Sequence, residues 1–229
     1  MNTPFQNLDD IVLQLREHGA IMIPGFLSHE KCDTLAESIR SLVSSVDVSK
    51  TYECKEYLVN STGPNRINTY PKLCSYRKPV LNIRSMHDKD FIDIFNADKL
   101  FDLSWLRNST TIADVIGCIN SSLKVKNINV YVSSASTPKR GYHYDTAPGI
   151  AQFKALVYLT DVTDESFGPY SYILGSHKAM NIKPNENNTQ VFCGKRGTVI
   201  LSNQNGLHCG IGSQKDGKER IVAVANIMV

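Results

Sequence analysis

The segment 141–146 carries the side chains whose types and spacing are best suited to bind a metal ion. His143 and Asp145 lie two positions apart, so they project from the same face of an extended chain. One further imidazole would complete a 2-His-1-carboxylate facial triad, the ligand set of non-haem Fe(II) oxygenases, which leaves positions open for co-substrate and dioxygen. His208, in a short apolar segment followed by Gly210, is the candidate for that third ligand.

A His-x-Asp pair alone is a weak indication, because a surface strand with two polar side chains explains most such triplets. Here the pair is followed in order by an apolar strand, a glycine-marked turn, His208 and, twelve residues later, Arg220. This ordered series fits one metal site better than it fits a set of unrelated surface residues.

Length and charge limit the other classes of function. A chain of 229 residues can bury a large core and fits one domain, 1–229. Its 25 Lys and Arg side chains against 22 Asp and Glu give a net charge of only +3, so neither nucleic acid nor a membrane surface is predicted as a partner. A small-molecule substrate remains the expected partner, and the sequence leaves the oligomeric state open.

The N-terminus and the cysteines indicate a cytoplasmic protein. The first ten residues contain neither a basic segment nor an apolar one of the kind that directs export. The six cysteines show no Cys-x-x-Cys spacing, so reduced thiols are the simplest interpretation. No apolar run approaches the length needed to span a bilayer.

The first part of the chain is predicted to be helical. Residues 8–17 carry apolar side chains at helical spacing, and Gly19 follows as a C-terminal glycine commonly does. A short strand follows over 20–27, closed by Pro-Gly, and Ser28 then caps a second helix.

The second part is predicted to be rich in strands. Residues 44–76 resemble a loop, and helical periodicity resumes over 91–101 and 112–119. Short β-strands dominate thereafter, over 128–132, 153–159, 170–174, 190–192, 197–201 and 221–229. This order predicts a mainly β fold with flanking α-helices, in which a closed or sandwiched β-core is backed by the N-terminal helices.

Three segments resemble the phytanoyl-CoA dioxygenase-like (PhyH) family of Fe(II)/2-oxoglutarate-dependent oxygenases. Residues 155–162 read ALVYLTDV, residues 168–178 contain GPY and YILGSHK, and residues 18–27 are similar to the family's N-terminus. The likeness covers about 8–43 and 125–229. It implies a double-stranded β-helix of the jelly-roll or cupin-like kind. In it, 125–229 form the β-core with the metal site, and about 44–124 form an insert with helices that shapes substrate selection.

The resemblance also implies a role for particular residues. His143, Asp145 and His208 would bind Fe(II), and Arg220 would form a bidentate salt bridge with the distal carboxylate of 2-oxoglutarate. Such enzymes use O2 to decarboxylate 2-oxoglutarate oxidatively, which yields succinate and CO2 and removes hydrogen from the substrate. Related halogenases replace the metal carboxylate with a small residue, so Asp145 argues for hydroxylation, desaturation or cyclisation over halogenation.

Three further residues are candidates for binding the co-substrate. The family often has a Ser or Thr at the position of Gly210, and Ser213 is the nearby hydroxyl that could substitute for it. If alternate residues of 153–159 face the barrel interior, Lys154 does too, and a buried ammonium needs an anion such as a 2-oxoglutarate carboxylate. Tyr131 could direct its hydroxyl into the same cavity. The alternatives are that Lys154 extends to solvent and that Tyr131 is ordinary core.

The substrate and the reaction are less closely defined. Arg140 and Arg84 are candidates for a cationic entrance that would favour an acidic small molecule, an amino-acid derivative or a natural-product intermediate. A 2-oxoglutarate-dependent hydroxylase is the leading hypothesis. The alternatives are a cupin-like metalloenzyme that does not use 2-oxoglutarate and a non-catalytic β-barrel ligand-binding protein. His177 is expected to form turn hydrogen bonds and not to bind the metal.

Overall fold

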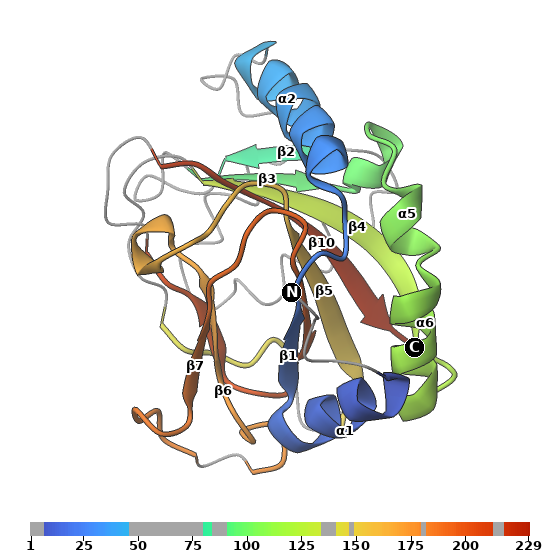
Figure 1. Cartoon of the computed structure of the whole chain (residues 1–229), viewed down its shortest axis with the longest axis vertical. Helices are drawn as coiled ribbons and strands as arrows, with labels where there is room; N and C mark the ends of the chain where they lie inside the picture. The colour runs from blue at the N-terminus through green and yellow to red at the C-terminus, as the bar shows by residue number, and fades with distance from the viewer. Residues whose placement is uncertain are drawn as a thin grey trace.

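The computed structural model describes residues 7–45, 80–83, 91–133, 141–146, 149–179, 182–212 and 218–229, and only the backbone of 45, 80–83 and 91. Within these residues the chain forms two antiparallel sheets with helices against one of them (Figure 1). This arrangement confirms the predicted mainly β jelly-roll core with flanking helices.

The larger sheet contains seven of the described strands, and each strand is antiparallel to its neighbours. In spatial order they are β1 (Ala20–Ile23), β8 (Val199–Asn203), β5 (Gln152–Tyr158), β10 (Arg220–Met228), β4 (Lys124–Ser133), β3 (Phe91–Phe95) and β2 (Val80–Ile83). The smaller sheet has the order β7 (Thr189–Phe192), β6 (Tyr170–Ile173) and β9 (His208–Gly210). The strands expected from 125 onward are thus present.

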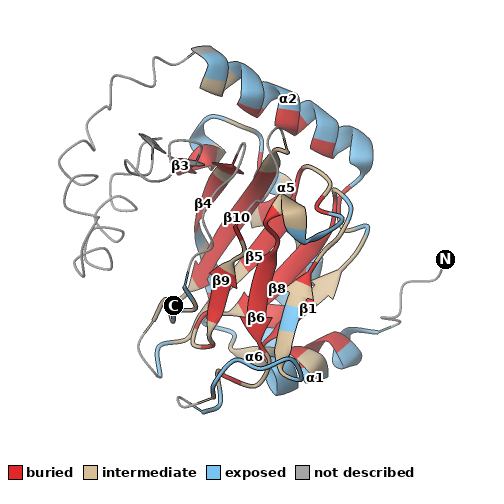
Figure 2. Ribbon diagram, turned by 90° about the vertical axis from the view of Figure 1, so that its left-hand side faces the viewer, coloured by how far each residue is buried: buried red, intermediate tan, exposed pale blue. Residues whose placement is uncertain are grey.

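The larger sheet is buried on both faces. In β10, every residue from Ile221 to Ile227 is buried, because alternate side chains enter two different cores. One core lies between the outer face of the sheet and the helices, and the other lies between the two sheets, where Leu156 and Val224 meet Tyr172 of β6. Figure 2 shows this burial along the central strands. A sheet held on both faces is a rigid support for any side chain on its inner face.

Four helices of the described residues lie outside the larger sheet: α1 (Leu8–His18), α2 (His29–Ser45), α5 (Ser104–Arg107) and α6 (Thr110–Ile119). The described residues also form 3-10 turns at Ala97–Lys99 and Glu165–Phe167. The Asn7 side chain accepts a hydrogen bond from the Asp10 amide and begins α1. Gly19, with φ 84°, ends it in the left-handed conformation. The Ser28 hydroxyl accepts from the Lys31 amide and begins α2. The predicted helices at 8–17, after Ser28 and at 112–119 are therefore confirmed.

The prediction of helix over 91–101 is wrong. Residues Phe91–Phe95 form strand β3, and only Ala97–Lys99 form a 3-10 turn. The sequence FIDIF alternates, with Ile92 and Ile94 on one face and Asp93 on the other, and β-branched side chains suit a strand. Asn96, with φ 52°, then breaks the extended chain. Pairing with β4 therefore outweighs a short stretch of helical spacing.

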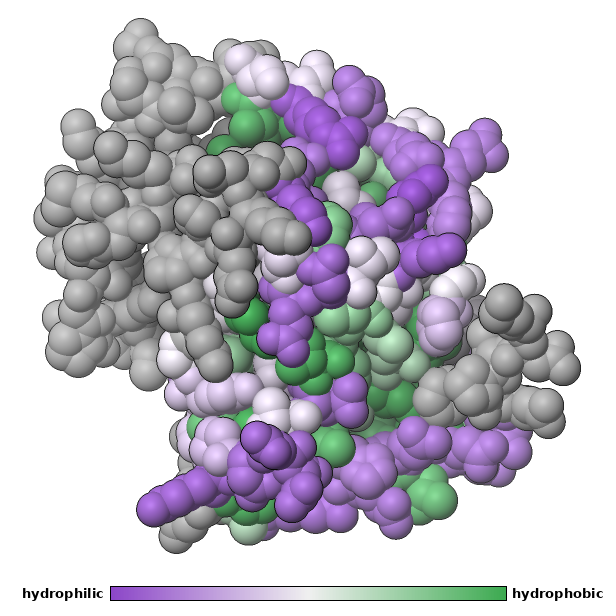
Figure 3. All heavy atoms as spheres, turned by 60° about the vertical axis from the view of Figure 1, so that its left-hand side comes forward, coloured by the Kyte–Doolittle hydropathy of each residue, from purple (hydrophilic) through white to green (hydrophobic). Residues whose placement is uncertain are grey.

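The described surface is mixed in character. In Figure 3, hydrophilic side chains cover the upper and lower ends of the visible face, and apolar side chains appear mainly between them. None of the described helices is long and apolar enough to cross a lipid bilayer.

Candidate metal centre

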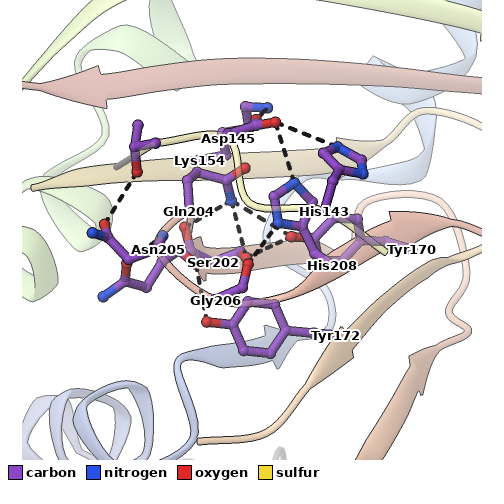
Figure 4. A network of polar contacts seen from close by, with 12 residues as sticks. His143, Asp145, Lys154, Tyr170, Tyr172, Ser202, Gln204, Asn205, Gly206 and His208 are labelled. Carbon is purple, nitrogen blue, oxygen red and sulfur yellow. Dashed lines mark hydrogen bonds and ion pairs between the residues drawn. The ribbon is translucent and has the colours of Figure 1, made fainter. Parts of the chain in front are cut away.

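His143, Asp145 and His208 converge at one point between the sheets. Their candidate ligand atoms all lie within 4.8 Å of one another. Oδ1 of Asp145 lies 3.4 Å from Nε2 of His143 and 3.6 Å from Nε2 of His208. Figure 4 shows both imidazoles turned toward this carboxylate. Three ligand atoms this close can share one metal ion with bonds of about 2.0–2.2 Å.

Backbone pairing brings the two histidines together. The His143 amide donates to the His208 carbonyl at 3.0 Å, and the His208 amide donates to the His143 carbonyl at 3.1 Å. The Asp145 amide donates to the carbonyl of Gln204 at 3.2 Å. The extended chain expected at His143 and Asp145 thus forms only an isolated bridge at His143, yet the segment lies along β9 closely enough to align the three side chains.

Both imidazoles are held in the tautomer that a metal requires. Nδ1 of His143 lies 2.9 Å from the carbonyl oxygen of Gly141, and Nδ1 of His208 lies 2.9 Å from that of Gly206. A carbonyl can only accept, so each Nδ1 carries the hydrogen and each Nε2 presents a lone pair toward Asp145. Such a partner for the second nitrogen fixes the orientation of metal-binding histidines.

The charges at the site favour a carboxylate and a neutral imidazole. Burial alone would raise the pKa of Asp145, but the Lys154 ammonium and the two nearby imidazoles outweigh it and hold that pKa well below its usual range. Burial lowers the pKa of His208, against the effect of the nearby carboxylate. The site therefore offers the Asp145 carboxylate as an anionic donor and the His208 imidazole as a neutral nitrogen donor, a combination that suits a divalent transition metal.

A tyrosine orders the loop that leads to His208. The Tyr172 hydroxyl donates to the carbonyl of Asn203 at 2.9 Å. A Cβ on Gly206 would lie 1.8 Å from the Tyr172 oxygen, and one on Gly19 would lie 2.4 Å from it. Two glycines thus leave the space that the phenol fills beside the loop, which in turn presents His208.

Arg220 lies on the side of the site that faces β9. Its Nε is buried and has no hydrogen-bond partner among the described residues. Burial lowers the pKa of Arg220 from its usual value. A Cβ on Gly210 would lie 3.9 Å from Nη2 of Arg220. Gly210 and His208 share a face of β9, because they lie two positions apart in the strand.

That arrangement is suited to a carboxylate ligand. A buried guanidinium with an unsatisfied N–H is costly unless an anion pairs with it. Because residue 210 is glycine, no side chain occupies the position next to Nη2. A carboxylate could therefore approach the guanidinium from this side, and the binding of 2-oxoglutarate by Arg220 stays a prediction.

Lys154 and Tyr131 both face the interior between the sheets. Lys154 pairs in register with Asn226 of β10, two positions from the inward-facing Leu156, and its ammonium forms an ion pair with Oδ2 of Asp145. The anion beside Lys154 in the structure is thus Asp145. Tyr131 packs against the inter-sheet core. Lys154 therefore faces inward as expected. The packing of Tyr131 fits either interpretation of that residue, and contact of both side chains with a co-substrate stays a prediction.

Three buried polar residues near the triad were missed in the sequence. The Tyr170 hydroxyl lies 2.7 Å from Oγ of Ser202, and Nε2 of Gln204 donates to that same Oγ at 3.1 Å. The Tyr170 ring packs beside His208, with centroids 5.6 Å apart (Figure 4). A signal was available, because Ser202 and Gln204 continue the inward parity of Ile200 in β8 with polar side chains.

The other sequence candidates fall into two groups. Ser213, Arg140 and Arg84 lie outside the described residues. Nε2 of His177 lies 3.0 Å from the Arg16 carbonyl, so this ring contacts α1.

Three solved structures of similar shape illustrate the likeness. The non-haem α-ketoglutarate-dependent epimerase SnoN from nogalamycin biosynthesis is 17% identical with a TM-score of 0.66, and the match covers 96% of this chain and 82% of SnoN. The carbocyclase SnoK from the same biosynthesis is 15% identical with a TM-score of 0.67, over 99% of this chain and 86% of SnoK. HygX from Streptomyces hygroscopicus, with nickel and 2-oxoglutarate bound, is 14% identical with a TM-score of 0.65, over 96% and 86%.

At identities this low, the structural similarity establishes a shared fold and nothing more specific. No curated protein matches the chain by sequence. The family model of phytanoyl-CoA dioxygenase (PhyH), however, matches residues 15–215, which include the middle segment that the sequence resemblance leaves out. The chain therefore belongs to the phytanoyl-CoA dioxygenase family.

Proposed function

We propose that this protein is a non-haem Fe(II)/2-oxoglutarate-dependent oxygenase that hydroxylates a small molecule. The observation that carries the proposal is the convergence of His143, Asp145 and His208, with both Nε2 atoms directed at one carboxylate oxygen. Membership of a dioxygenase family and a fold shared with iron- and 2-oxoglutarate-dependent enzymes support it.

The three side chains would hold iron from one side only. When bound, iron with 2-oxoglutarate and O2 supplies the oxidative decarboxylation to succinate and CO2 and the oxidising power that removes hydrogen from a substrate. The protein has no need of a nucleophile or a general base, so its residues position, neutralise charge and exclude water. The carbonyls of Gly141 and Gly206 keep both imidazoles oriented.

Arg220 would bind the distal carboxylate of 2-oxoglutarate. Its planar guanidinium suits a bidentate pair with a carboxylate, and the unsatisfied Nε supports this role. Lys154 adds a second positive charge close to the triad, so the site as a whole favours a dianion. Ser213 and Tyr131 are proposed as additional polar contacts.

A small molecule is the proposed substrate class. Among the enzymes of similar fold, SnoN has been solved with nogalamycin RO and HygX with hygromycin B. An amino-acid derivative or a natural-product intermediate fits that pattern, and Arg140 and Arg84 are proposed to attract its acidic groups. Hydroxylation is the reaction proposed, while an epimerase and a carbocyclase among the similar structures show that this fold also supports other outcomes.

The direct test combines spectroscopy with product analysis. Anaerobic addition of Fe(II) and 2-oxoglutarate should produce a visible charge-transfer band, and admission of O2 with a panel of small metabolites should yield succinate. Asp145→Ala should produce neither signal. Metal binding without succinate under any condition would favour the cupin-like alternative, and the absence of both metal binding and the band would favour a ligand-binding protein.

A further inference from the structure

The two oxygens of Asp145 have different partners. Oδ1 faces Nε2 of both histidines, at 3.4 Å and 3.6 Å. Oδ2 is bound by the ammonium of Lys154. One carboxylate therefore presents one oxygen to the metal position and the other to a cation that belongs to the protein. Figure 4 shows both imidazoles directed toward this carboxylate.

The position of Lys154 is fixed by the larger sheet. Lys154 lies on β5, directly opposite Ser202 of β8 and Asn226 of β10. These neighbours are buried and its own side chain is 15% exposed, so the ammonium is confined to the inner face. Because β5 pairs on both sides, the ammonium cannot leave Asp145 by a shift of its strand.

We infer that Lys154 is a positioning residue that couples metal binding to co-substrate binding. The Lys154 ammonium occupies Oδ2, so Asp145 can bind a metal through Oδ1 alone. The same ammonium repels a divalent cation and attracts a dianion. The inference rests on the proposed function, since it concerns the metal and 2-oxoglutarate at the same triad.

Charge bookkeeping gives the direction of the effect. Asp145, Lys154 and Arg220 together carry a net charge of +1, so a divalent metal alone raises the charge of the site to +3. A dianionic co-substrate lowers it to +1, and its affinity rises accordingly. Without Lys154 the site would carry +2 with the metal alone and no net charge with the dianion, so the metal would be repelled less and the dianion attracted less. Metal alone should thus bind less tightly in the natural protein than in a variant without this ammonium.

Calorimetric titration of the metal-free protein with Mn(II), in the absence and presence of 2-oxoglutarate, tests the coupling. In Lys154→Met, Mn(II) alone should bind about tenfold more tightly, and 2-oxoglutarate should bind the Mn(II)-loaded protein about tenfold less tightly. Lys154→Arg, which keeps the charge, should restore both affinities toward the original values. Co(II)-loaded protein should show a changed visible spectrum in Lys154→Met and a restored one in Lys154→Arg, because the second carboxylate oxygen becomes available to the metal.

A matched control is Lys218→Met. Lys218 is also paired with an aspartate, Asp164, at 3.6 Å, but this pair is not part of the triad. Its removal should leave both affinities unchanged. Thermal unfolding of each variant separates a folding defect from a change at the site.

The outcomes separate this inference from the proposed function. Mn(II) binding that disappears in Asp145→Ala supports the triad as the metal site, whatever Lys154 does. If Lys154→Met then binds Mn(II) alone with unchanged or weaker affinity, the inferred role of Lys154 is wrong and the triad stands. If the natural protein binds no Mn(II), the proposed function itself is wrong.

Discussion

The two sheets contribute different kinds of side chain to the same site. The smaller sheet supplies His208 from β9 and pairs with the segment that carries His143. The larger sheet supplies the cations, Lys154 from β5 and Arg220 from β10. Neutral donors therefore come from short, loop-bordered segments, and the fixed positive charges come from long strands buried on both faces. The difference suggests that metal geometry depends on local backbone contacts and that charge placement depends on the rigid core.

The largest effect is expected for the triad itself. Asp145→Ala should lower metal affinity and turnover by at least about a hundredfold, because the anionic ligand is lost and Lys154 is left without its partner. Metal content after dialysis and Mn(II) titration measure this. Asp145→Glu is the matched control and should keep part of the binding; full metal occupancy in Asp145→Ala would refute the assignment of the ligand.

Substitution of the cation that β10 of the larger sheet supplies should instead weaken binding of the co-substrate. Arg220→Leu should raise the concentration of 2-oxoglutarate required for half-maximal succinate formation by about ten- to a hundredfold, the loss expected for a charge-assisted hydrogen bond. Metal affinity in the absence of 2-oxoglutarate should remain close to the original value. Arg220→Lys should recover part of the effect. An unchanged requirement in Arg220→Leu would mean that another residue binds the distal carboxylate.

A substitution in the loop before His208 should mainly lower the stability of the folded protein. Gly206→Ala would place a Cβ 1.8 Å from the Tyr172 oxygen, so the phenol or the loop must move. The expected cost is about 1–3 kcal/mol in the free energy of unfolding, with weaker metal binding as a consequence. Urea unfolding of the metal-free protein measures it. Gly117→Ala is the control, since a Cβ there meets no atom within 4 Å.

The smallest effect is expected for the hydroxyl that orders the same loop. Tyr172→Phe removes the hydrogen bond to the carbonyl of Asn203 and should cost about 1 kcal/mol in unfolding free energy. Metal affinity should fall only a few-fold, because the ring still fills its space. A loss of metal binding as large as that of Asp145→Ala would mean that Tyr172 acts on the site more directly than the contact suggests.

Much of the fold was predictable because local signals agreed with the tertiary structure. Asn7 and Gly19 bound the first helix, alternating apolar residues mark β4, and a nearly continuous apolar run marks β10. The exception, Phe91–Phe95, shows the limit: a five-residue apolar segment suits a helix or a strand, and only its pairing with β4 decides between them.

The candidate site was predictable to the extent that residue type alone indicates chemistry. His143 and Asp145 are two residues apart, and His208 and Arg220 follow in the order of a known family. The partner of Lys154 was not predictable, because strand parity gives the face on which a side chain lies but not which anion reaches it. Likewise Ser202, Gln204 and Tyr170 act together only because β8 and β6 meet across the interior.

The backbone bridge between His143 and His208 ties ligand geometry to the integrity of the barrel rim. A cation bound by both rings would also hold the His143 segment against β9, so part of its binding free energy would stabilise this edge against local unfolding. The metal would then stabilise the fold at this edge in addition to its role in the reaction.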